Sequence, residues 1–166
     1  DMPNNEQVEW AKNLRERIAK KENISTKISI LDTGVRNTHI LLSDFLNDKD
    51  CFVYSNWDID DIDGHGTAMA GLALYCDLQY YLESSENLLL EHELESFKIL
   101  PEKGENEPKL YGAITSEAIS ELIIENASTK RIICMAITAP TYQTDDGSPS
   151  SWSAAIDSIT SGYVDE

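Results

Sequence analysis

The segment around His65 constrains the fold of this chain more than any other. Glycines stand on both sides of the histidine, at Gly64 and Gly66, and they let the backbone turn sharply and approach a ligand closely. The run that follows, residues 68–74, is apolar and rich in small side chains, which suits a buried helix packed tightly against a sheet. We therefore expect His65 to lie at the start of a helix, where it can face a cleft while its backbone stays fixed.

A second constrained stretch, residues 27–34, has the pattern of a short buried strand that ends in a carboxylate, Asp32, and a glycine turn. Together the two stretches offer an aspartate and a histidine on rigid elements, as nucleophilic catalysis requires. Taken alone, the Asp-Thr-Gly motif is weak, because it also occurs in aspartic proteases and a strand-end aspartate can bind magnesium in an α/β phosphotransferase. Aspartic proteases are β-rich and need a second such carboxylate, and this sequence has neither feature.

The length and composition indicate one soluble globular domain. With 166 residues, of which 41% are hydrophobic and 26% charged, the chain is long enough to bury a core. Its formal net charge of −17 argues against a nucleic-acid partner, because binding phosphates requires a basic face. We interpret the acidity as a solvated surface, with cationic peptides and metal ions as the alternative ligands.

The cysteines and the apolar runs bear on the cellular compartment. Cys51, Cys76 and Cys134 are an odd number in apolar surroundings, so we expect buried free thiols and no disulfide framework. The sequence shows no signal peptide and no apolar run long enough to span a bilayer, so no membrane partner is predicted. These features favour the cytoplasm without fixing the compartment, since the chain opens with Asp1-Met2 and a leader could have been removed.

Hydrophobic periodicity and turn signals divide the chain into alternating helices and strands. This alternation predicts an α/β fold with a mainly parallel sheet flanked by helices. The strand at 131–137 is expected to be buried, and Ile123 to lie on the inner face of its helix. The predicted helices are residues 5–20, 66–76, 113–127 and 152–159, and the predicted strands are residues 28–31, 51–54, 95–100 and 131–137. Residues 102–109 and 139–151 are predicted to be loops, and the secondary structure of residues 77–95 stays undecided.

The acidic segment 58–64 resembles a calcium loop in composition. A regular EF-hand loop has acidic residues at positions one, three and five, glycine at six and a closing glutamate at twelve. Counted from Asp58, glycine falls at position seven and Met69 at position twelve, so the spacing does not fit. We therefore predict no metal site and no cofactor, with calcium in this loop as the alternative. A second alternative is that these acids select basic residues next to a cleaved bond by charge complementarity.

The aspartate and histidine motifs in combination resemble the subtilases, the subtilisin-like serine proteases. The resemblance covers roughly residues 24–162 and implies a subtilisin-like α/β fold. Four segments carry it, each similar to a strand or helix of the family: Asp32-Thr33-Gly34-Val35 followed by His39, residues 63–71 (Asp-Gly-His-Gly-Thr-Ala-Met-Ala-Gly), residues 97–100 (Phe-Lys-Ile-Leu) and residues 131–135 (Arg-Ile-Ile-Cys-Met).

Two departures from the family pattern affect the expected chemistry. The family commonly has Ser-Leu-Gly after the strand that ends beside the substrate, where this chain has Ala136-Ile137-Thr138. The family also needs a Gly-Thr-Ser nucleophile motif and an oxyanion-hole asparagine before it, and residues 1–166 contain neither. We therefore expect residues 1–166 to be a partial subtilisin-like peptidase domain, truncated before the serine-bearing part, with residues 1–23 as a leading helix.

The resemblance assigns roles residue by residue. His65 would be the general base and Asp32 would orient its ring, as members of a Ser-His-Asp triad that hydrolyses peptide bonds. Tyr111 would wall an outer substrate pocket, and the segment Ala136-Ile137-Thr138 would pair with the backbone of a polypeptide substrate as an added strand. The implied function is that of a serine endopeptidase in the parent protein, with this fragment inactive alone because it lacks the nucleophile.

Other interpretations stay open. A degenerate subtilase could keep the cleft as a non-catalytic peptide-binding protein, and the altered segment Ala136-Ile137-Thr138 favours this reading. An α/β regulatory domain that uses Asp32 for metal or phosphate would leave the glycine-flanked His65 unexplained. His39 is expected to be structural, and His92, which stands among glutamates, to be exposed. A truncated domain should also expose a sheet edge and apolar helix faces, which predicts self-association.

Overall fold

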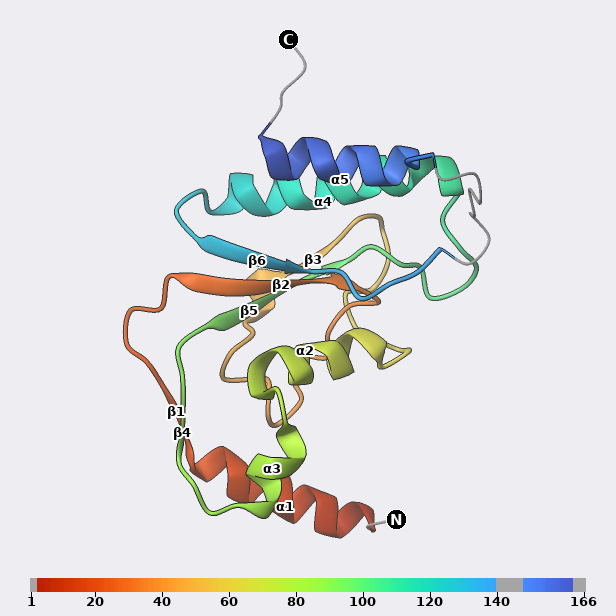
Figure 1. The fold of residues 1–166 in the computed structure, drawn as a ribbon. Helices are drawn as coiled ribbons and strands as arrows, with labels where there is room; N and C mark the ends of the chain where they lie inside the picture. Colours follow the sequence, from red (N-terminus) through yellow and green to blue (C-terminus); the bar gives the residue numbers. More distant parts are fainter. Residues whose placement is uncertain (1–2, 140–147, 163–166) are drawn as a thin grey trace.

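A parallel sheet organises the computed structural model, which describes residues 3–139 and 148–162. Within the described residues the sheet has 4 strands in the order β3-β5-β2-β6. Each neighbouring pair runs parallel, so the predicted mainly parallel sheet is confirmed (Figure 1). The strands are β2 (Thr26–Asp32), β3 (Cys51–Val53), β5 (Glu93–Lys98) and β6 (Lys130–Cys134).

Helices cover both faces of this sheet, as the alternation of strands and helices predicts (Figure 1). One face carries α2, and the other carries α4 with α5 packed above it. These helices are α2 (His65–Tyr75), α4 (Tyr111–Glu125) and α5 (Ser151–Ser161). The side chain of Ser150 accepts a hydrogen bond from the Ser153 backbone N–H, which caps α5.

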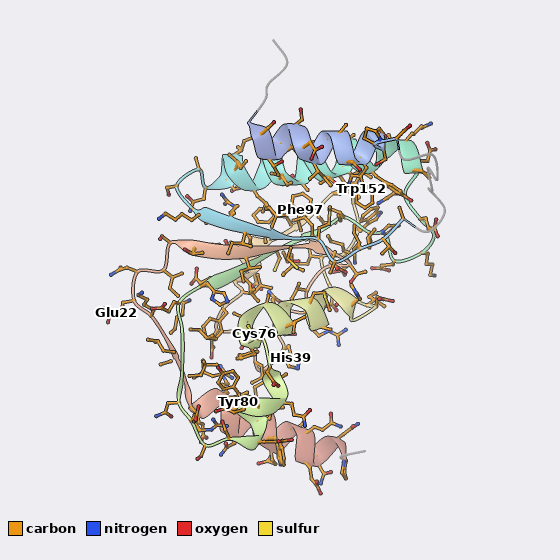
Figure 2. All side chains as sticks on the ribbon, in the orientation of Figure 1. Glu22, His39, Cys76, Tyr80, Phe97 and Trp152 are labelled. Carbon is orange, nitrogen blue, oxygen red and sulfur yellow. The ribbon has the colours of Figure 1, made fainter. Side chains whose placement is uncertain are left out.

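Side chains alternate along β2 and divide the core into two apolar clusters. Ile30 belongs to a cluster on the α2 side, whereas Leu31 belongs to a cluster on the α4 side. Phe97 of β5 is fully buried in the second cluster, between the sheet and α4 (Figure 2). The last four residues of β2 are buried, so the end of the strand at Asp32 is held firmly by the layers around it.

The N-terminal part differs from the single helix predicted over residues 5–20. The first helix ends earlier, and Ile18 belongs to a strand that pairs in parallel with a strand inside the undecided segment 77–95. This small sheet lies with two helices away from the main sheet (Figure 1). Local periodicity could not reveal the pairing, because the two strands are far apart in sequence. The elements of this part are α1 (Asn4–Glu16), β1 (Ile18–Lys20), α3 (Leu78–Glu83) and β4 (Leu88–Leu90).

Two predictions of burial near the β6 edge are wrong. The strand predicted over residues 131–137 ends at Cys134, and Ile132 and Ile133 are 59% and 38% exposed. Ile123, predicted for the inner face of α4, is 49% exposed. The apolar run predicted burial, but β6 is the last strand of the sheet, and no strand pairs with its outer edge within the described ranges.

Some single residues also differ in exposure from their prediction. Cys51 and Cys134 are partly buried free thiols, and burial raises the pKa of Cys51 to about 12, but Cys76 is exposed at the end of α2. His92 is partly buried rather than exposed, with its Nε2 atom 3.2 Å from the carbonyl oxygen of Ala73. Tertiary packing decides the exposure of each of these side chains, because it depends on whether a neighbouring element covers the side chain.

The remaining described segments are loops and two short 3-10 helices, η1 (Asp48–Asp50) and η2 (Pro108–Leu110). Of the loop predicted over residues 139–151, residues 140–147 lie outside the described ranges. A membrane-crossing helix would have to be long and apolar, and no helix in the described part of the chain is both.

Candidate active site

Asp32 is the last residue of β2, as the sequence predicts, and its side chain is buried. It pairs with Lys98 in the neighbouring strand β5, so its backbone is fixed in the sheet. The Oδ1 atom accepts a hydrogen bond from the Thr33 backbone N–H at 2.8 Å. The Oδ2 atom is buried and accepts no hydrogen bond from the residues that the structure describes.

His65 is the first residue of α2, where the flanking glycines predict it. Gly64 takes a φ of +88°, a left-handed conformation that glycine adopts without strain, and this turns the chain into the helix. The His65 Nδ1 atom lies 2.7 Å from Asp32 Oδ1, although the two residues are 33 apart in sequence. The histidine side chain is 43% exposed while that of the aspartate is 1% exposed. The pair therefore has a buried, fixed end and an end open to solvent.

The surroundings of His65 favour its protonated form. The hydrogen bond that His65 donates to Asp32 raises the pKa of the ring above its ordinary value of 6.5, and partial burial opposes that rise. The negative charges of Asp32, Asp63 and Asp61 add to the increase. An imidazolium formed during a proton transfer would be stabilised here by the same carboxylates.

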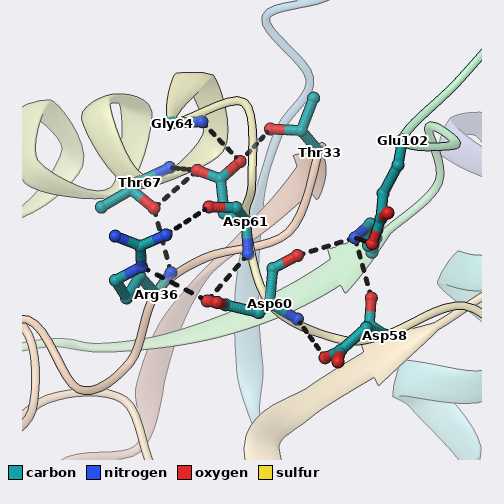
Figure 3. Close-up of polar contacts among 9 residues, drawn as sticks. Thr33, Arg36, Asp58, Asp60, Asp61, Gly64, Thr67 and Glu102 are labelled. Atoms are coloured by element: carbon teal, nitrogen blue, oxygen red, sulfur yellow. Dashed lines mark hydrogen bonds and ion pairs between the residues drawn. The ribbon is translucent and has the colours of Figure 1, made fainter.

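The carboxylate of Asp61 connects the start of α2 to the turn that follows β2 (Figure 3). It is almost fully buried, and it accepts hydrogen bonds from Gly64 and Thr67 of the helix start and from the hydroxyl of Thr33. Burial opposes ionisation of Asp61, but the hydrogen bonds from Thr67, Gly64 and Thr33 hold its pKa below the ordinary range. These contacts fix the two segments that carry Asp32 and His65 to one another.

The same two segments also meet through their backbones. Gly66, in the first turn of α2, lies so close to the turn after β2 that an added Cβ would stand 2.0 Å from the carbonyl oxygen of Gly34. Only a residue without a side chain allows this approach. This close packing of α2 is made by Gly66, which precedes the run of small residues 68–74 from which the sequence predicts a tightly packed helix.

Lys98 holds the acidic segment 58–64 against the sheet. Its side chain is 1% exposed, and its Nζ atom donates to the carbonyl oxygens of Asp58 at 2.8 Å and Asp60 at 2.7 Å. The Asp61 carboxylate already accepts four hydrogen bonds, so its oxygens have no lone pair left for a cation. In residues 3–139 and 148–162 no group of three His, Cys, Asp or Glu side chains is arranged to hold a metal ion.

A small pocket on the α4 side of the sheet is lined by three of the four residues that are predicted to bind substrate. Tyr111, Ile137 and Thr138 line it together, whereas Ala136 does not line it and is exposed. The ring of Tyr111 packs against Trp152 with centroids 5.2 Å apart. These residues come from the start of α4, the segment after β6 and the start of α5. Their role in binding a substrate stays a prediction.

Sequence reasoning missed three residues of this region. Asp61 was one of several acids in the segment 58–64, and only its place four residues before His65 could have singled it out. Thr33 stands next to Asp32, where the sequence indicates only a turn. Trp152 begins a predicted helix, and no local pattern indicates its contact with Tyr111, which is distant in the sequence.

Comparison with known proteins agrees with this geometry. The family model Peptidase_S8, described as Subtilase family, matches residues 23–166. Searches of curated proteins and of solved structures gave no significant match. The matched range includes both Asp32 and His65 and most of the chain, and the fold around them is the parallel α/β arrangement expected of such a domain. The chain belongs to the subtilase family.

Proposed function

We propose that the parent protein is a serine endopeptidase, which hydrolyses peptide bonds with a Ser-His-Asp triad, and that Asp32 and His65 are two of its members. One observation carries the proposal: the 2.7 Å contact between His65 Nδ1 and Asp32 Oδ1. The aspartate is buried and the histidine is 43% exposed, so the free edge of the ring is accessible to a substrate and a nucleophile. Membership of the subtilase family supports the same reaction class.

The proposed mechanism gives each nitrogen of His65 one task. An ionised Asp32 can only accept, so Nδ1 carries the proton of that bond and Nε2 keeps its lone pair. As a serine oxygen attacks the peptide carbonyl carbon, Nε2 takes the hydroxyl proton and later gives it to the departing amine nitrogen. Asp32 holds the tautomer and stabilises the imidazolium between these two steps.

The nucleophile and the oxyanion-hole asparagine would come from outside residues 1–166, because this sequence holds no Gly-Thr-Ser motif. The asparagine side chain would hydrogen-bond the developing oxyanion, an interaction that contributes about 3 kcal/mol in such enzymes. Residues 1–166 alone should therefore show no amidase activity. Amidase activity of this fragment that disappears in His65→Ala would contradict the proposal.

The proposed substrate is a polypeptide bound in extended form. The segment Ala136-Ile137-Thr138 follows β6 with exposed residues at both ends, which suits backbone pairing with an added strand. The pocket of Tyr111, Ile137 and Thr138 beside it would receive one outer side chain of the peptide. The net charge of −17 opposes a nucleic-acid substrate, and the proposed chemistry needs no cofactor.

The experiment uses the parent protein, extended by about 150 residues past Glu166 so that the domain is complete. It is treated with a fluorophosphonate probe, which labels an activated serine, with Asp32→Ala and His65→Ala as matched controls. Labelling of one serine that is lost in both controls is the expected result. Circular dichroism of all three proteins establishes that each is folded.

The second candidate is a non-catalytic peptide-binding protein. The observation in its favour is the segment Ala136-Ile137-Thr138, which departs from the Ser-Leu-Gly that the family commonly has there. A folded parent protein that shows no labelling, and still binds extended peptides, would establish this function in place of the first.

A further inference from the structure

The Asp61 carboxylate has an unusually complete set of hydrogen bonds. Its Oδ1 atom accepts from the Thr33 hydroxyl at 2.8 Å and from the Gly64 backbone N–H at 2.8 Å. Its Oδ2 atom accepts from the backbone N–H of Thr67 at 2.8 Å and from the Thr67 hydroxyl at 2.6 Å. Asp61 is 1% exposed, so water does not compete for these four bonds. Figure 3 shows the donors converging on it from the helix start and from the β2 turn.

Thr33 extends this network to the other side of the histidine. Its hydroxyl donates to Asp61 and accepts a hydrogen bond from the Gly66 backbone N–H at 3.0 Å. Its own backbone N–H donates to Asp32 Oδ1 at 2.8 Å. Both glycines that flank His65 are thus tied, directly or through Thr33, to one buried carboxylate.

The start of α2 needs these bonds because its N-cap residue makes no side-chain hydrogen bond. Gly64 stands at the N-cap position of α2 and offers no side chain to cap the free N–H groups. Asp61, three residues earlier, supplies the missing acceptors. Without these bonds the backbone around His65 would be flexible, because glycine restricts the φ and ψ angles less than any other residue does.

We propose that Asp61, acting through Thr33, Gly64 and Thr67, is a positioning residue that keeps the Nδ1–H of His65 on Asp32. This inference rests on the proposed function, since positioning matters to catalysis only if His65 is the general base. The carboxylate of Asp61 is buried and bonds to Thr33, Gly64 and Thr67 rather than to His65, so its effect on the ring passes through the backbone of α2 and the turn after β2. The contact of 2.7 Å would loosen when the carboxylate is lost, because the helix start could then shift along the sheet edge.

The experiment reads the His65 ring directly by NMR in residues 1–166 labelled with ¹⁵N in the imidazoles. The Nδ1–H proton, deshielded by its bond to Asp32, is observed at low temperature, and the ring is titrated with pH. Asp61→Asn keeps the shape of the side chain but replaces one acceptor oxygen with an NH₂ group that faces donors. We expect the Nδ1–H signal to be lost and the ring pKa to fall towards its ordinary value of about 6.5.

Asp63→Asn is the matched control, because it removes the same charge close to His65 from an exposed residue with no hydrogen bond in this network. It should lower the pKa of the ring while the Nδ1–H signal stays. If folded Asp61→Asn keeps that signal and its pKa changes no more than in Asp63→Asn, then Asp61 acts only as a charge and the inference is overturned.

A second pair of variants decides the question should Asp61→Asn fail to fold. Thr33→Val removes the hydroxyl at nearly the same volume, and Thr33→Ser retains the hydroxyl with one methyl group fewer. Loss of the Nδ1–H signal in the valine variant with recovery in the serine variant supports the inference, and equal signals in both overturn it. The ring signals need no nucleophile, so this result is independent of the fluorophosphonate test. Labelling can fail while Asp61 still positions His65, and labelling can succeed while Asp61 has no effect on the His65 ring.

Discussion

Gly66 in α2 lies directly against the carbonyl oxygen of Gly34 in the turn after β2, with room for no atom between them. The contact is a backbone-to-backbone one, so no side chain can rotate away to relieve an intrusion. Gly66 also follows His65 directly and lies close to Asp32, so a change at this position affects both the packing of α2 and the geometry of the Asp32–His65 pair.

Gly66→Ala should therefore be strongly destabilising. The new Cβ would stand 2.0 Å from the Gly34 oxygen and 3.2 Å from Asp32 Cβ, so α2 has to move away from the sheet. We expect a loss of about 3 kcal/mol in the free energy of unfolding, measured with urea. Gly71→Ala is the matched control in the same helix, because an added Cβ meets nothing within 4 Å there. It should stabilise the chain by about 0.5–1 kcal/mol, and equal losses in both variants would contradict the steric argument.

The stability conferred by His65 should fall as pH rises. Because the hydrogen bond that His65 donates to Asp32 raises the pKa of the folded ring above 6.5, the contribution of the ring to stability is fully present below the unfolded pKa and is lost as pH rises through the folded pKa. The ring is 43% exposed, so solvent screening keeps the effect small. The unfolding free energies of the wild type and His65→Ala are compared from about pH 5.5 to about pH 8.5.

We expect the advantage of the wild type over His65→Ala to shrink across that range. Both proteins retain the other two histidines, so the comparison isolates His65. A difference that stays constant or grows with pH would mean that the Asp32 contact does not favour the protonated ring.

Lys98→Met should release the acidic segment from the sheet. The methionine has a similar length but leaves the carbonyl oxygens of Asp58 and Asp60 without the ammonium group that now binds them. Hydrogen bonds to a buried charged group support an expected loss of about 2–3 kcal/mol, again measured by urea unfolding. Lys103→Met, at an exposed position in the next loop, serves as the control and should change stability by less than about 0.5 kcal/mol. Similar values for the two variants would remove the proposed role of Lys98.

The β6 edge should mediate self-association of residues 1–166. Ile132 on this edge strand is 59% exposed and Ile124 on the neighbouring helix α4 is 80% exposed, and unpaired strand edges invite pairing with a second copy. Light scattering of the wild type should show a dimer or larger species, and Ile132→Lys should shift it towards the monomer. Leu89→Lys is the control, because Leu89 is 55% exposed but lies in the small sheet. A monomeric wild type, or an equal effect of both lysines, would count against the β6 edge.

Much of the fold could be predicted from local patterns. The apolar run before Asp32 and the small residues after His65 indicate that both segments are buried. The alternation of strands and helices implies that the strands pair in parallel. The pairing of β1 with β4 could not be predicted, because Ile18 and Leu88 acquire their partners only through the folded chain. The exposure of Ile132 could not be predicted either, since an apolar run indicates a strand but not the neighbours of that strand.

The sequence by itself determined the family, the two motifs and the residue types of the proposed site. Spacing and glycine placement suffice for this, because they are properties of short segments. Only the tertiary structure decided that Asp32 and His65 meet at 2.7 Å, and that Asp61, among several similar acids, turns its carboxylate inward to hold their two segments together. Hydrogen bonds between distant segments depend on where packing brings their backbones, and no local pattern contains that information.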